Sequence, residues 1–152
     1  MSKNDGKEIE KWVRDCATEN HWSLHRLADS KSAGRIIQAQ PADYMGVIAG
    51  VPVLLECKSS ERFDSFKDCR LKDFIKPTQF ASFKMWERNR GCGLFVFHSV
   101  FGKNIEIWSS YVILEAYSGG WSVQEPIEVM DKKTLTKGIE KSLRYWSKHY
   151  VR

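Results

Sequence analysis

The chain has 152 residues, with 24 Lys and Arg against 19 Asp and Glu, which gives a formal net charge of +5 at pH 7. Hydrophobic residues make up 42% of the chain, enough for one core without disulfides or structural metals, so wholesale disorder is excluded. The longest apolar runs, residues 51–55 and 94–97, are far shorter than the roughly 18 residues of a membrane-spanning helix, so no membrane span is expected. The N-terminus carries no apolar signal region. We therefore expect a cytoplasmic protein with reduced, packed cysteines, and the basic excess favours a nucleic-acid partner.

The first part of the chain is predicted to form a helix followed by a β-hairpin. Apolar residues spaced i, i+3, i+4, i+7 and i+8 predict an amphipathic helix over residues 7–20. Residues 21–27 have no clear pattern, and residues 29–38 are expected to form a turn and a short strand. Two apolar runs, residues 44–48 and 51–57, flank an Ala-Gly pair, which predicts a hairpin with glycine in its tight turn.

The second part of the chain adds helices around further strands. Residues 59–76 are expected to be a loop with at most a short helical turn. A first-position proline and a following glycine predict a helix over residues 77–90, and the unbroken apolar run after it predicts a strand buried on both faces. The remaining predicted elements are a strand at residues 105–108, a short helix near 111–117 and a helix over 134–150. This order predicts an α/β fold in a single domain over residues 1–152, with a mixed β-sheet flanked by helices.

The second hairpin strand is predicted to place a carboxylate and an amine on one face. Period-2 alternation puts Glu56 and Lys58 on the face opposite Cys57. A two-residue turn sets a register in which Asp43 lies opposite Glu56, unless a bulge shifts it. Opposed carboxylates are destabilising without a cation between them, and Mg²⁺ takes oxygen ligands from one or two carboxylates together with water and phosphate oxygens. Lys58 would project toward the same ion.

A less specific interpretation of these residues stays open. Asp43 could simply end a turn after Pro41, and Glu56 and Lys58 could be a solvated edge of the sheet. The local context argues against this, because Glu56 lies in one of the most apolar strands of the chain, where an unpaired acid costs stability.

At these residues the chain resembles a family of nucleases. Pro41-Ala42-Asp43, twelve further residues and Glu56-Cys57-Lys58 are similar to the signature of the PD-(D/E)xK nuclease superfamily. Over about residues 6–97 the chain looks more specifically like the RecU-type Holliday-junction resolvases. Their pattern of Asp-Tyr, a nearby Gly, Glu-x-Lys and a Gln that opens a helix is matched here by Asp43-Tyr44, Gly46, Glu56-Cys57-Lys58 and Gln79. Gly6 and Glu10 are similar to the first-helix pattern of that family.

The resemblance implies a restriction-endonuclease-like fold and a metal-dependent endonuclease. Mg²⁺, with Mn²⁺ as a substitute, would be bound by Asp43, Glu56 and the backbone carbonyl of Cys57. Lys58 would serve the attacking water or the transition state, while Glu10 and Gln79 would assist it. The implied substrate is branched DNA, a four-way junction of recombination and repair, cut by a homodimer. The short chain fits a phage-encoded form, so a bacterial cell or a phage-infected host is the expected location.

The residues by themselves leave some roles open. Glu8 and Glu10 lie at similar angles from the apolar stripe of the first helix, and an alternative for Glu10 is a surface ion pair with Arg14. An alternative for Gln79 is a hydrogen bond to backbone at the helix start. The basic residues expected to contact DNA are Arg35, Lys67, Arg70, Lys72 and Lys76.

Two other functions also fit the sequence. The first is a nuclease of the same superfamily that acts on linear duplex DNA in restriction or repair. The second is a basic DNA-binding module without catalysis, which would bind DNA with a steep salt dependence and show no metal-dependent cleavage.

Overall fold

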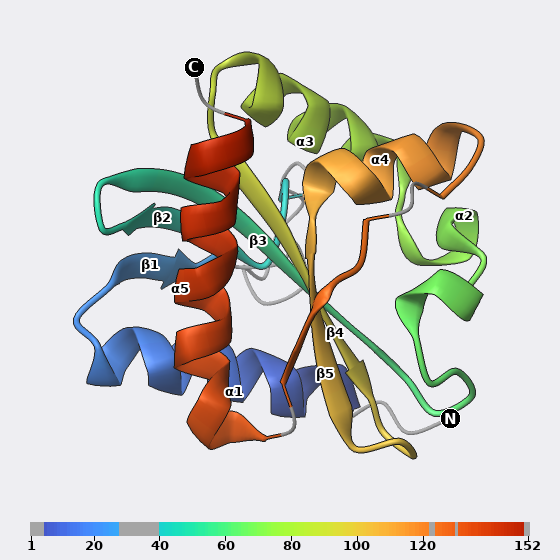
Figure 1. Cartoon of the computed structure of the whole chain (residues 1–152), viewed down its shortest axis with the longest axis horizontal. Helices are drawn as coiled ribbons and strands as arrows, with labels where there is room; N and C mark the ends of the chain where they lie inside the picture. The colour runs from blue at the N-terminus through green and yellow to red at the C-terminus, as the bar shows by residue number, and fades with distance from the viewer. Residues whose placement is uncertain (1–4, 28–39, 122–123, 130, 151–152) are drawn as a thin grey trace, which may run out of the picture.

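The computed structural model describes residues 5–27, 40–121, 124–129 and 131–150. The described helices are α1 (Asp5–Glu19), α2 (Leu71–Phe74), α3 (Pro77–Arg88), α4 (Ser110–Ser118) and α5 (Lys132–His149), with a short 3₁₀ turn at Phe66–Asp68. The described strands are β1 (Ser23–Arg26), β2 (Tyr44–Ile48), β3 (Val51–Ser60), β4 (Cys92–Ser99), β5 (Asn104–Ser109) and β6 (Ile127–Val129). Figure 1 shows their arrangement.

The described strands form one sheet in the order β1-β2-β3-β4-β5-β6. Every neighbouring pair is antiparallel except β3 and β4, which run parallel. A parallel pair requires a crossover connection, and here the segment that contains α3 provides it. The predicted α/β architecture with a mixed sheet is therefore confirmed.

Helices cover both faces of the sheet and bury a separate core on each. In Figure 1, α5 crosses in front of the sheet and α1 runs below it. Both helices bury their apolar stripes against one face, with Ile9, Val13, Leu135 and Ile139 packed around Leu55. On the other face the main contributors are Leu71, Phe83, Ile113, Leu54 and Phe95. The central strands β3 and β4 are thus covered from both sides.

The main elements predicted from the sequence are present. The helix predicted over residues 7–20 is α1, the hairpin is β2 and β3, and the C-terminal helix is α5. Every residue of β4 is buried, as expected for a strand covered on both faces. All four cysteines are free and buried, which confirms their prediction as packing thiols. None of the described helices is long and apolar enough to cross a membrane.

Three regions differ from the prediction or were not predicted. The segment 59–76, expected to be mostly a loop, contains the end of β3 and the helix α2. The edge strands β1 and β6 were not predicted, because each is short and has one fully buried residue. The strand expected at residues 35–38 lies outside the described residues.

The hairpin has the tight two-residue turn that its sequence predicts. Ala49 and Gly50 both have positive φ angles, 49° and 80°, as the hairpin turn that matches strand twist requires. Ile48 pairs with Val51, and the register continues without a bulge to Tyr44 opposite Leu55. The residue before Tyr44 therefore arrives opposite Glu56, as the sequence predicted.

Candidate active site

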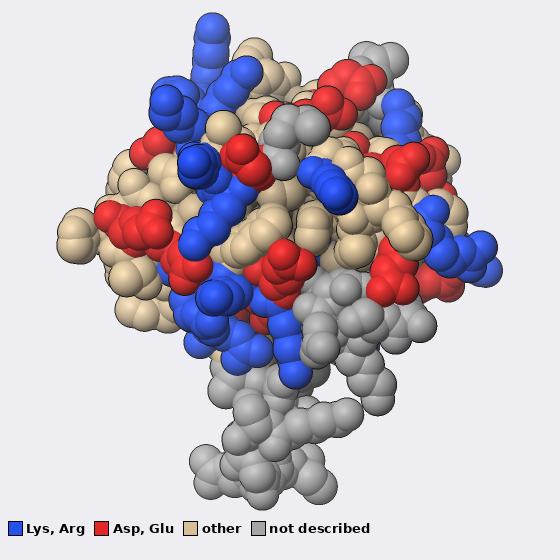
Figure 2. Space-filling view, turned by 90° about the horizontal axis from the view of Figure 1, so that it is seen from below, with Lys and Arg blue, Asp and Glu red and all other residues tan. Residues whose placement is uncertain are grey.

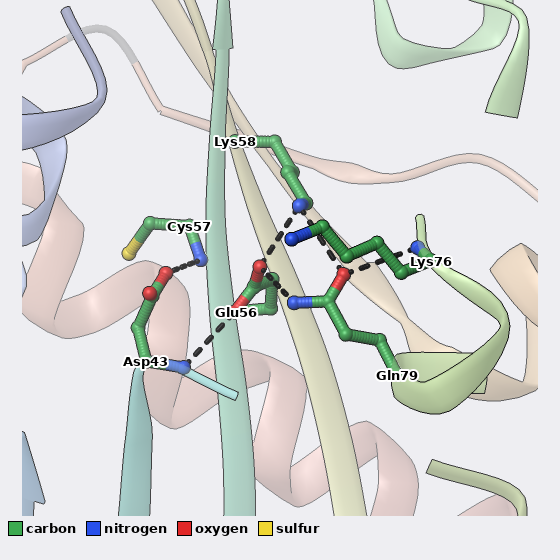
Figure 3. A network of polar contacts seen from close by, with 6 residues as sticks. All are labelled: Asp43, Glu56, Cys57, Lys58, Lys76 and Gln79. Carbon is green, nitrogen blue, oxygen red and sulfur yellow. Dashed lines mark hydrogen bonds and ion pairs between the residues drawn. The ribbon is translucent and has the colours of Figure 1, made fainter. Parts of the chain in front are cut away.

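Asp43 and Glu56 lie opposite each other where β2 begins, and the carboxylate of each accepts a backbone N–H from the opposite strand (Figure 3). The backbone N–H of Asp43 donates a hydrogen bond to Glu56 Oε1 at 2.9 Å. The N–H of Cys57 donates to Asp43 Oδ2 at 2.8 Å. These two bonds across the strands fix both carboxylates where the pairing of β2 with β3 ends.

The second carboxylate oxygen of Glu56, Oε2, contacts the amine of Lys58 and the side-chain amide of Gln79. Lys58 Nζ lies 2.9 Å from Glu56 Oε2, and Gln79 Nε2 donates to the same oxygen at 2.8 Å. The side chains of Glu56 and Lys58 are only 5% and 17% exposed. The alternative that these two residues form a solvated sheet edge is therefore wrong.

Gln79 makes the helix-start hydrogen bond that its alternative predicted and also contacts Glu56 and Lys58. It lies in the first turn of α3, where its Oε1 accepts a hydrogen bond from the backbone N–H of Lys76 at 3.4 Å. The same oxygen lies 3.5 Å from Lys58 Nζ, while its amide nitrogen donates to Glu56. Gln79 thus joins the start of α3 to the carboxylate, and its amide orientation is fixed from both ends.

Glu10 reaches the same site from α1. The hydroxyl of Tyr44, a fully buried residue of β2, donates to the backbone carbonyl of Glu10 and so ties this turn of α1 to the hairpin. The carboxylate of Glu10 pairs with Arg26 of β1 at 3.3 Å, and among the described residues it forms no ion pair with Arg14. Glu8 lines a different pocket. Of the two acids left open by the helical pattern, the structure brings Glu10 to the site.

Glu10, Asp43, Glu56 and Gln79 line one pocket of about 240 Å³, and Lys58 is not among its lining residues. It is bounded by α1, β1, the β2–β3 pair and the start of α3, and its lining is Glu10, Arg26, Leu27, Gln40, Ala42, Asp43, Glu56, Lys76, Thr78 and Gln79. The pocket therefore holds carboxylates from three separate elements, in reach of a ligand from solvent.

The charges in this pocket are unevenly balanced. Lys58 compensates Glu56 and Arg26 compensates Glu10, whereas Asp43 has no ion pair among the described residues. Burial, together with the charges of Glu56 and Glu10, raises the pKa of Asp43 from its ordinary 3.8 to about 8. A cation beside Asp43 would lower its pKa again and relieve this repulsion.

The donor set fits a hard divalent cation in part. Burial keeps the pKa of the Cys57 thiol well above its ordinary value, so the side chain stays a neutral thiol packed in the core. Its carbonyl is on the same strand edge as its N–H, which points to Asp43. In the described part of the chain, no three His, Cys, Asp or Glu side chains are grouped as a metal site. Asp43, Glu56 and the carbonyl of Cys57 would give two of the three carboxylates and a carbonyl, a set that Mg²⁺ completes with water and phosphate oxygens.

The predicted DNA contacts are only partly near this pocket. Lys76 lines it. Lys67 lies 3.9 Å from Glu125 and Arg70 lies 4.0 Å from Asp73, both exposed pairs of little energetic weight. Lys72 lies over the ring of Tyr117 at 5.9 Å from its centroid. These three are not among the residues that line the pocket. The further candidate, Arg35, lies outside the described residues.

Arg26 is the charged residue of the site that sequence reasoning missed. It lies in β1, whose four residues have a single buried member, so the segment shows no alternation that would mark a strand. The pairing of Arg26 with Glu10 depends on β1 joining β2, a contact between distant parts of the chain. No local signal in the sequence points to it.

Comparison with known proteins adds no relative. No protein-family model matches this sequence, and no curated protein matches it either.

Proposed function

We propose that this protein is a Mg²⁺-dependent, structure-selective DNA endonuclease that cuts four-way junctions by phosphodiester hydrolysis. The observation that carries the proposal is the meeting of Asp43, Glu56 and Gln79 at one pocket, with Lys58 bonded to Glu56 and Gln79 and with the pKa of Asp43 raised. Perturbed acids in a cleft are typical of functional sites. The mixed sheet flanked by helices is the architecture that the resemblance to the PD-(D/E)xK nucleases implies.

Each residue has a defined task in this proposal. Asp43, Glu56 and the Cys57 carbonyl would hold the ion, which when bound neutralises phosphate charge and lowers the pKa of a bound water. Lys58 is held by Glu56 and Gln79, two residues that line the pocket, and its ammonium would donate to the scissile phosphate as negative charge grows. Gln79 would keep the Glu56 carboxylate oriented through its amide hydrogen bond. Glu10 would accept a hydrogen bond from the attacking water.

The choice of a junction as substrate comes from the RecU-type resemblance. A four-way junction has two-fold symmetry, so the proposal includes a homodimer whose two pockets face opposite strands. The two other functions considered for the sequence, cleavage of linear duplex and DNA binding without cleavage, predict different results in the same assay.

The test is cleavage of an end-labelled four-way junction and a matched linear duplex, in Mg²⁺, Mn²⁺ or EDTA. Wild type is compared with Glu56→Gln and with Glu128→Gln, a control that removes the same charge from an exposed position on β6. We expect paired nicks in the junction alone, lost in EDTA and in Glu56→Gln and retained in Glu128→Gln. Equal cutting of both substrates would keep the chemistry and replace the junction by linear duplex. No cutting in either metal would overturn the proposal in favour of a DNA-binding module.

A further inference from the structure

A second pocket adjoins the candidate active site. It has a volume of about 310 Å³ and is lined by Lys7, Glu10, Lys11, Arg14 and Arg26. Glu10 and Arg26 also line the pocket of Asp43 and Glu56, so the two pockets share one wall. Figure 2 shows the molecule from below, where Lys and Arg side chains are interspersed with Asp and Glu side chains.

The cations of this second pocket form a regular row on α1. Lys7, Lys11 and Arg14 are spaced i, i+4 and i+7, so they lie along one side of the helix, and all three are exposed. None of them forms an ion pair within the described part of the chain, and the acid of the pocket, Glu10, is already paired with Arg26. Four cations against one acid leave a local excess of three positive charges, which favours an anionic ligand.

We propose that this basic groove binds the phosphodiester backbone of duplex DNA beside the bond that is cut, an inference that rests on the proposed function. The row from Lys7 to Arg14 spans seven residues, about 10 Å at 1.5 Å per residue. Successive phosphates of one B-DNA strand rise about 3.4 Å each along the duplex axis, so a row parallel to that axis spans about three steps. A strand that followed α1 would continue directly into the pocket of the carboxylates.

The chain contains a matched control for this row. Lys137, Lys141 and Arg144 on α5 have the same residue types at the same spacing, and they too are exposed. Lys141 and Arg144 line a different pocket, which shares no residue with the candidate active site. Replacing either row by glutamine removes three positive charges, so only a local contact with DNA separates the two variants.

The experiment measures the binding of a fluorescent duplex in EDTA at several salt concentrations. The variants are Lys7→Gln/Lys11→Gln/Arg14→Gln and Lys137→Gln/Lys141→Gln/Arg144→Gln, each first checked for wild-type thermal unfolding. Each lost phosphate contact lowers the salt slope of log K by about 0.9. For the α1 variant we expect the slope to fall by about 2–3 and the affinity at about 0.1 M salt to fall roughly 100- to 500-fold. For the α5 variant we expect a change below about threefold.

The outcomes separate this inference from the proposed function. Equal losses of DNA affinity in both variants would mean that only net charge matters, and this would overturn the proposal that the groove binds DNA. Wild-type affinity in the α1 variant would overturn it as well. Cleavage by the wild type is measured separately with Mg²⁺. If the wild type cuts DNA and the α1 variant binds DNA as tightly as the wild type, the groove proposal fails and the nuclease proposal stands. If the wild type does not cut and the α1 variant still loses its binding, the nuclease proposal fails and the groove stands as a DNA-binding surface.

Discussion

Replacing Asp43 with asparagine is expected to stabilise the metal-free protein at neutral pH while abolishing its cleavage activity. The carboxyl of Asp43 is half-buried beside Glu56, and its pKa is raised to about 8. Asparagine has the shape of the protonated acid, and its side-chain oxygen can still accept the hydrogen bond from the N–H of Cys57. The variant therefore keeps the geometry of the site and removes the charge that the fold disfavours.

The magnitude follows from proton linkage. The folded-state pKa of Asp43 is raised above its unfolded value of 3.8, so the stability it contributes is complete below about pH 4 and is lost as the pH rises through about 8. Between these limits the folded protein holds up to one proton more than the unfolded chain. One proton corresponds to about 1.4 kcal/mol per pH unit, so the wild type should lose up to about 3 kcal/mol relative to Asp43→Asn between about pH 5 and pH 7.

The assay is urea unfolding of both proteins in EDTA at about pH 5, 6 and 7. The difference in the free energy of unfolding between wild type and Asp43→Asn should change with pH at up to the slope given above. Excess Mg²⁺ should reduce the difference, because an ion that binds the ionised carboxylates stabilises only the wild type. Parallel pH profiles for the two proteins in EDTA would refute the reasoning, since Asp43 would then titrate alike in both states.

Three further variants probe other parts of the structure. Gln79→Ala removes the amide that orients Glu56, and we expect cleavage to slow by about 10- to 100-fold in a junction assay while the thermal midpoint changes little. Burial raises the pKa of Glu87, so its charge costs stability once the pH exceeds about 4.5, and Glu87→Gln should raise the thermal midpoint at pH 7 and leave it unchanged near pH 4. A Cβ on Gly46 would lie 1.8 Å from a carbonyl oxygen of β1, so Gly46→Ala should lower the free energy of unfolding by at least about 1–3 kcal/mol. Gly119→Ala, with no atom within 4 Å of its Cβ, is the control that should leave urea unfolding nearly unchanged.

The predicted elements were those with strong local patterns. The stripes of α1 and α5 and the unbroken apolar run of β4 each bury a continuous face, and the sequence repeats that face at the helical or strand period. The edge strands β1 and β6 bury one residue each, so pairing with a neighbour rather than apolar alternation makes them strands. The last residues of β3 extend as a strand because they pair with β4, a partner more than thirty residues away.

The residues of the candidate site also fall into those that a local pattern predicts and those that long-range packing brings in. The opposition of Asp43 and Glu56 follows from a two-residue turn within the hairpin, so a local register argument was enough to predict it. Gln79 was found through the resemblance, because nothing local shows that the start of α3 reaches β3. Arg26 depends on the packing of β1 and α1 against the hairpin and had no signal in the sequence. Long-range packing thus supplies the groups that surround the carboxylates.

The charged groups of the candidate site lower the stability of the fold. The pair of Glu56 and Lys58 is buried in the central part of the sheet, where apolar residues of similar size would serve packing as well or better. Asp43 adds a carboxylate whose raised pKa marks it as unfavourable in its charged form, and Glu10 brings a further negative charge from α1. A sequence selected for stability alone has no reason to collect these acids at one pocket. A divalent cation would balance them, and this supports the proposed assignment of the pocket to phosphoryl chemistry rather than to the stability of the sheet.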